Sequence, residues 1–78
     1  MSTYEKIIQV CETIFEGDVD LTHVTPDSLL KEDLGLNSIA LLYMAIALET
    51  EFSIKFTNDD FTLIKKVSDV VRSVESKL

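Results

Sequence analysis

The side chain of Ser38 is the strongest candidate for chemistry in this 78-residue chain. It follows the glycine-containing segment Asp33–Asn37 and precedes the apolar run Ile39–Leu48, which has no charged side chain. This order places a serine hydroxyl at the start of a helix, directly after a flexible turn. Free backbone N–H groups and the helix dipole favour an anion at such a position. The spacing therefore predicts a serine that can carry a phosphate.

A serine at a helix start also has a purely structural interpretation, as the residue that caps the helix. Serine is among the preferred N-cap residues, and the local pattern taken alone favours this role for Ser38. The preceding residue, Asn37, has a side chain that caps a helix equally well. If Asn37 is the cap, the Ser38 hydroxyl is free to react.

The other residues that could do chemistry do not form a site in the sequence. His23 has no second histidine or cysteine at the spacing of a zinc site. Asp18 and Asp20 begin a pattern like a calcium loop, but His23 and Leu29 replace the required glycine and glutamate. We therefore expect no metal site. No phosphate-binding glycine loop, dinucleotide fingerprint or nucleophile elbow is present, so no enzyme class is indicated.

The charge of the chain excludes some partners. The formal net charge is −7, which argues against DNA or RNA as a ligand. Six acidic residues and only one basic residue, Lys31, lie between Glu16 and Asn37. Such a segment either keeps the loop solvated or attracts basic partners, and on charge alone the first interpretation is slightly favoured.

The cysteine count and hydropathy bear on the compartment. Cys11 is the one cysteine, so an internal disulfide is impossible, and a reducing cytoplasm is the expected location. We expect Cys11 to be a small core residue with low reactivity. The longest uncharged run is too short to span a bilayer, which takes about 20 residues.

The periodicity of apolar residues predicts an all-α fold. We expect a first helix from about Thr3 to Phe15 or Glu16, a second from Ser38 to Phe52, a brief third from Asp59 to Leu63, and a fourth that begins at Val67. A long loop should connect the first two helices, with a short turn that begins at Thr25. The result is one domain over residues 1–78, a four-helix bundle with three longer helices and one short one.

The second predicted helix is apolar on two sides. At 100° per residue one side is a core stripe, formed by Leu41, Met44, Ala45, Leu48 and Phe52. The nearly opposite side carries a second stripe, formed by Ile39, Leu42, Tyr43 and Ile46. A small bundle cannot bury both stripes. We expect the long loop to cover part of Leu42 and a partner to contact Ile39, Tyr43 and Ile46.

The chain resembles the acyl carrier protein family along its whole length. The residues that carry the resemblance are Asp33–Ile39, Ala47–Glu49 and Glu51–Phe52, with Val24–Thr25, Ile54–Phe56 and Val67 at matching places. The resemblance implies a four-helix bundle that is a carrier and not an enzyme. It also implies that Ser38 is esterified by a 4′-phosphopantetheine arm from coenzyme A, and that the arm's thiol carries acyl groups as thioesters.

The resemblance further implies partners. A phosphopantetheinyl transferase would attach the arm, and acyl-transferring or ligating enzymes of one pathway would load and unload it. We expect the carrier to act as a monomer. The candidate partner-binding residues lie around Ser38 and on the outer stripe, and are Asp33, Asn37, Ile39, Leu42, Tyr43 and Ile46. A short acyl chain is expected to lodge in the core beside Leu41, Met44, Leu48 and Phe52.

Three residues depart from the pattern of the family. Asn37 stands where aspartate usually precedes the modified serine. Ala40 and Tyr43 stand where members that serve fatty-acid synthesis usually have acidic residues. These losses should weaken docking to generic basic partners and favour apolar contacts. They predict a carrier dedicated to one fatty-acid, polyketide or related pathway.

A second serine imitates the site. Asp27-Ser28-Leu29 has the Asp-Ser-Leu triplet typical of the family's attachment site, but it follows Pro26 within the loop and does not open a long helix. We interpret Ser28 as part of a short turn, with Leu29 or Leu30 anchoring the loop to the core.

Two alternatives remain open at the level of sequence. The weakened acidic face also suits a peptidyl or aminoacyl carrier that is loaded by an adenylating ligase. An unmodified helical module could instead use the outer stripe to bind a partner helix. Modification of Ser38 separates both carrier interpretations from the module.

Overall fold

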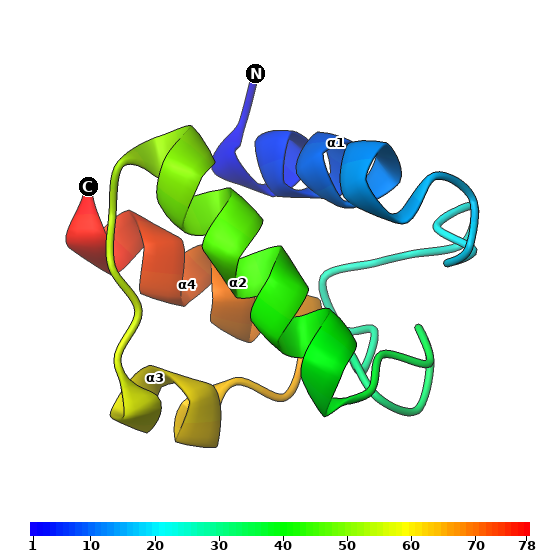
Figure 1. The fold of residues 1–78 in the computed structure, drawn as a ribbon. Coiled ribbons are helices and arrows are strands. Elements are labelled where there is room, and N and C mark those ends of the chain that lie inside the picture. Colours follow the sequence, from blue (N-terminus) through cyan, green and yellow to red (C-terminus); the bar gives the residue numbers. More distant parts are fainter.

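The computed structural model describes residues 1–78 as four helices without strands (Figure 1). They are α1 (Thr3–Phe15), α2 (Ser38–Phe52), α3 (Asn58–Leu63) and α4 (Val67–Lys77). The predicted all-α class is confirmed. The expected bounds of α1 and α2 and the start of α4 agree with the structure, whereas α3 begins one residue earlier than expected.

Local capping explains why the helices begin where they do. The Ser2 hydroxyl accepts the Glu5 N–H at 3.1 Å, and the Ser2 N–H donates to the Glu5 carboxylate at 3.0 Å, which together form a capping box. Thr57 and Asp60 form the same arrangement at the start of α3. These reciprocal bonds satisfy N–H groups that would otherwise lack a partner within the helix.

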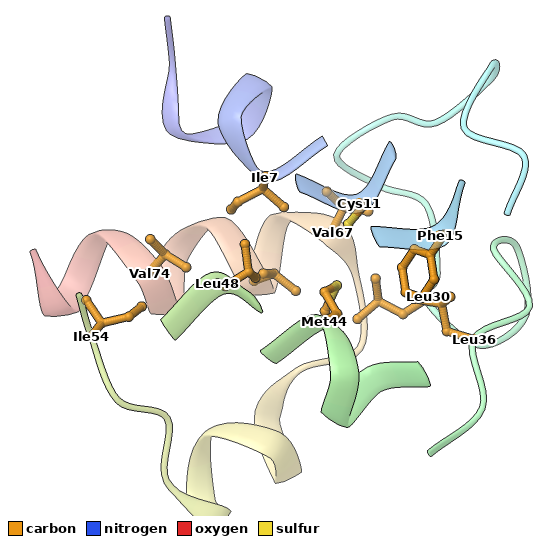
Figure 2. Close-up of a cluster of buried hydrophobic side chains, with 11 residues drawn as sticks. Ile7, Cys11, Phe15, Leu30, Leu36, Met44, Leu48, Ile54, Val67 and Val74 are labelled. Carbon is orange, nitrogen blue, oxygen red and sulfur yellow. The ribbon is translucent and has the colours of Figure 1, made fainter. Parts of the chain in front are cut away.

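The core lies where α1 packs against α2 and α4 (Figures 1 and 2). Its members from the helices and the loops are Ile7, Cys11, Phe15, Leu30, Leu36, Met44, Leu48, Ile54, Val67, Val70 and Val74. Leu48 and Val74 have no exposed surface. Four valines disfavour a helix locally, so packing against this core stabilises α4.

The long loop between α1 and α2 is tied to the start of α4. The Leu30 N–H donates to the Lys65 carbonyl at 3.0 Å, and the Val67 N–H donates to the Ser28 carbonyl at 3.0 Å, which creates an isolated antiparallel bridge between Leu29 and Lys66. Leu30 is buried, as expected for the residue that anchors the loop. These bonds hold the segment that leads into α2.

None of the four helices combines the length and the apolar character that crossing a bilayer requires.

Candidate functional site

The approach to α2 is shaped by Gly35 and Leu36. Gly35 has a φ of +71°, a left-handed conformation that costs glycine little and other residues more. The next residue, Leu36, is 3% exposed, and its N–H donates to the Leu30 carbonyl at 3.0 Å. The turn is therefore anchored in the core immediately before the helix starts.

Asn37 is the cap of α2. Its side-chain oxygen accepts the Ala40 N–H at 2.8 Å, and its backbone is extended while its carbonyl accepts the Leu41 N–H at 2.9 Å. Ser38 is the first residue inside the helix. The structural interpretation of Ser38 as the cap is therefore wrong, because the neighbouring asparagine fills that role.

The Ser38 side chain is exposed, and no hydrogen bond within the chain holds its hydroxyl. The N–H groups of Ser38 and Ile39 also have no acceptor within the chain. No acidic side chain occupies the first turn of α2. A phosphate on Ser38 would thus meet free N–H donors and the positive end of the helix dipole.

A groove of about 700 Å³ opens beside Ser38. It lies between the loop, α2 and the α3–α4 segment, and its apolar lining is Leu29, Leu30, Leu41, Leu42, Phe61 and Ile64. Two lysines, Lys31 and Lys65, also line it. A flexible arm attached at Ser38 has room to lie along this groove, since binding sites for small molecules commonly have such a volume.

A second, inner cavity lies deeper between α2, α3 and α4. Its volume is about 20 Å³, and all of its lining residues are hydrophobic. Leu41, Met44 and Leu48 line it, whereas Phe52 packs against the core elsewhere, so all four residues are part of the core or its margin as predicted. A cavity of this size holds about one water molecule and no acyl chain. The core as it stands therefore does not have the room that was expected for a short acyl chain.

The outer stripe of α2 is exposed along its length. Ile39 is 79% exposed, Leu42 54%, and Tyr43 and Ile46 52% each. About half of the Leu42 surface is covered, and Leu42 lines the same groove as the loop residues Leu29 and Leu30, so the expected partial cover of Leu42 agrees with the structure. One edge of Tyr43 is supported by Phe15, whose ring centroid lies 6.2 Å from that of Tyr43. The four side chains form one apolar surface that begins next to Ser38.

Asp33 and Asn37 have structural roles besides the predicted contact with partners. The Asp33 carboxylate accepts the Leu29 N–H at 2.7 Å and so closes the turn before α2. Its side chain remains exposed, as does that of Asn37. Contact of these two residues with a partner stays a prediction.

Ser28, the serine of the second Asp-Ser-Leu triplet, has a structural role in a turn. The Ser28 hydroxyl accepts the Thr25 N–H at 2.9 Å, and the Ser28 N–H donates to the Thr25 carbonyl at 3.0 Å. The predicted short turn at Thr25 is therefore present, but it does not continue into a helix. Ser28 is partly buried in this turn, and it has no helix start to receive a phosphate.

The remaining candidates have ordinary environments. Burial raises the pKa of the Cys11 thiol to about 11, with a smaller contribution from Glu12, and the residue is 4% exposed. The Asp20 carboxylate accepts the Thr22 N–H at 2.9 Å in a local turn. That backbone bond holds the pKa of Asp20 below its usual value. No three side chains of the metal-binding types gather at one place.

Sequence reasoning missed the far wall of the groove. Phe61, Ile64 and Lys65 reach the site because the bridge between Leu29 and Lys66 brings the α3–α4 segment beside the loop. The three-residue spacing of Phe61 and Ile64 was the available signal, since it puts both on one face of a short helix. The bridge joins two residues that are far apart in the chain, so no pattern in the neighbouring sequence predicts it.

Comparisons with known proteins agree with this geometry. A family model described as a phosphopantetheine attachment site matches residues 5–74. The acyl carrier protein of Solidesulfovibrio magneticus is 32% identical over 77 residues, which cover 99% of this chain and 96% of that protein. The acyl carrier protein of Helicobacter hepaticus is 34% identical over 76 residues, with 97% of both chains covered.

A solved structure is also similar. The crystal structure of an acyl carrier protein from Thermotoga maritima superimposes with a TM-score of 0.78 at 27% identity, covering 96% of this chain and 89% of that one. Together the bundle and the matched family define a phosphopantetheine-bearing carrier and not an enzyme. The chain belongs to the acyl carrier protein family.

Proposed function

We propose that Ser38 bears the 4′-phosphopantetheine arm and that residues 1–78 act as one carrier domain. The observation that carries this proposal is the cap on α2. Because the side chain of Asn37 bonds the Ala40 N–H, the exposed hydroxyl of Ser38 is left without a partner at the helix start. Ser28 lies in the same matched region, but its hydroxyl accepts a hydrogen bond within a turn.

Attachment of the arm requires no catalytic group from the carrier itself. The Ser38 oxygen forms a new bond to phosphorus, the nucleotide part of coenzyme A leaves, and the transferase takes the hydroxyl proton. The carrier must offer an accessible hydroxyl and a place for the resulting phosphodiester. The N–H groups of Ser38 and Ile39 supply that place, since they have no acceptor within the chain.

The test is the intact mass of the protein after incubation with coenzyme A and a broad-specificity phosphopantetheinyl transferase. We expect a gain of one phosphopantetheinyl group in the wild type and in Ser28→Ala, and no gain in Ser38→Ala. Ser28→Ala is the matched control, because it removes the hydroxyl of the rival triplet. If Ser38→Ala still gained the phosphopantetheinyl mass and Ser28→Ala did not, the assignment of the arm to Ser38 would be overturned.

We further propose that the outer stripe of α2 is the docking surface for the enzymes of a dedicated fatty-acid, polyketide or related pathway. The stripe begins next to Ser38 and its members are half exposed or more. Neither Tyr43, within the stripe, nor Ala40, beside it, is acidic, although family members that serve fatty-acid synthesis usually have acids at these two positions. Association would then rest on apolar contact and depend little on salt, in contrast to docking between charged surfaces.

The cellular setting belongs to the same proposal. Cys11 is a free cysteine and the one cysteine of the chain, so the fold has no internal disulfide, which suits a reducing cytoplasm. Transfer between enzymes requires that the carrier dissociate from each of them, which favours a monomer that docks through one modest surface. Cargo would rest in the groove beside Ser38 between these encounters.

A further inference from the structure

Helix α3 is joined to α4 by a partly buried ion pair. The Lys77 ammonium lies 2.9 Å from the Asp60 carboxylate, and the two side chains are 22% and 21% exposed. The only other ion pair of the chain, between Arg72 and Asp69, lies within α4 and has a largely exposed arginine. The contact between Lys77 and Asp60 is thus the one ion pair that connects two helices.

Few other contacts fix α3. The helix has six residues and none of them is buried, and its Phe61 side chain is 37% exposed. Lys77 compensates by making a second contact, because its ammonium lies 5.9 Å from the ring centroid of Phe56. The Phe56 ring in turn lies 6.1 Å from the ring of Phe61. Lys77 therefore contacts the segment that enters α3 as well as a residue within it.

The same segment forms one wall of the inner cavity. Phe56, Phe61 and Ile64 line the cavity, and Leu41 and Met44 of α2 lie across from them. Since the cavity has about 20 Å³, an acyl chain fits only if a wall of the cavity moves. The α3 wall is the least fixed of these walls, because α3 has no buried residue. Any contact that holds α3 against α4 opposes this movement.

We propose that Lys77 is a latch that limits which acyl chains the bundle can shelter. By holding Asp60 and Phe56 together, it keeps the α3 wall closed and leaves longer chains in the open groove beside Ser38. Lys77 does not contact the acyl chain itself. It is a positioning residue, because it holds the α3 wall of the cavity in place. This inference rests on the proposed attachment of the arm to Ser38.

The first test uses the unloaded protein. Lys77→Met removes the charge and keeps a long apolar side chain, while Arg72→Met is the matched control because it breaks the pair within α4. Hydrogen exchange should report faster opening at the N–H of Ile64, which donates to the Asp60 carbonyl at 3.1 Å. We expect an acceleration of about twofold to fivefold in Lys77→Met only.

The second test uses the acylated protein. Wild type and both variants are loaded with butyryl, octanoyl or dodecanoyl pantetheine, and the thioesters are cleaved with hydroxylamine. In the wild type, cleavage should depend weakly on chain length. In Lys77→Met, the longer thioesters should be cleaved several-fold more slowly, because the opened wall admits them.

The outcomes separate this proposal from the assignment of Ser38. If Ser38 cannot be loaded, the proposed function fails, and the exchange experiment still tests whether Lys77 holds α3. If loading succeeds and Lys77→Met matches Arg72→Met in both experiments, the latch is overturned. Faster exchange without any change in cleavage would also overturn it, because Lys77 would then stabilise α3 without limiting the cargo.

Discussion

Asn37 caps α2 and thereby leaves the hydroxyl of the adjacent Ser38 free. The asparagine oxygen lies 2.8 Å from the Ala40 nitrogen, so Ser38 becomes the first residue of the helix. Two neighbouring side chains that are both good caps thus have different roles. Asn37 stabilises the helix start, and Ser38 is the residue that we propose carries the prosthetic group.

The cap has a measurable effect on stability. Asn37→Ala removes the acceptor of the Ala40 N–H and should lower the free energy of unfolding by about 1 kcal/mol. Asn37→Asp keeps an acceptor at the same place and should unfold at a urea concentration close to that of the wild type. Urea titration monitored by circular dichroism checks both variants. Equal midpoints for Asn37→Ala and the wild type would show that the cap does not stabilise α2.

The uncharged outer face of α2 should determine partner choice. Tyr43→Glu places an acid on that face, and Ala40→Asp places one beside it at a partly buried position. Turnover with generic fatty-acid enzymes should rise several-fold in the double variant, since such charges speed docking to basic surfaces. Gln9→Glu with Thr13→Glu is the control, because it adds the same charge to exposed positions of α1. If both pairs change turnover equally, net charge and not the α2 face sets the rate.

The lone cysteine should be inert in the folded protein. With its pKa raised to about 11 by burial, the Cys11 thiol is ionised in about one molecule in a thousand at pH 8, and it is also inaccessible. A thiol reagent should therefore react with it many-fold more slowly in buffer than in concentrated urea. Comparable rates in the two solutions would mean that α1 leaves the core readily.

Stability should fall in acid through two aspartates that receive backbone hydrogen bonds. The N–H groups of Lys66 and Lys65 donate to Asp69, and that of Thr57 donates to Asp60, so both carboxyls have a pKa below the usual 3.8. A lowered pKa in the folded state stabilises the fold above pH 3.8. This stabilisation is lost as the pH falls through the folded-state pKa.

Urea midpoints measured between neutral pH and pH 2 would show this loss. Asp69→Asn should weaken the dependence on pH in this range, because the amide cannot ionise. Asp59→Asn is a suitable control, since the Asp59 side chain makes no hydrogen bond in the structure. A wild-type midpoint that stays constant down to pH 2 would contradict the assignment of these bonds.

The parts of the structure that depend on local pattern could be predicted from the sequence. The capping box of Ser2 and Glu5 and the apolar spacing of α2 involve residues within one or two helical turns. The bounds of α1 and α2 could therefore be predicted from the sequence. The cap at Asn37 was one of two local choices, and only the backbone geometry decides between them.

Features that join distant segments could not be predicted. The bridge between Leu29 and Lys66 and the ion pair between Asp60 and Lys77 depend on how the helices are arranged. Neither pairing has a signature in the residues next to it.

The most direct test of the central claim is to locate the arm on the loaded wild-type protein by peptide mass spectrometry. Trypsin cleaves after Lys31, so Ser28 and Ser38 fall in different peptides. Fragment ions then distinguish Ser38 from Ser53, which shares its peptide. We predict that the phosphopantetheinyl mass is found on Ser38 alone. Its presence on Ser28 or Ser53, with Ser38 unmodified, would contradict the account.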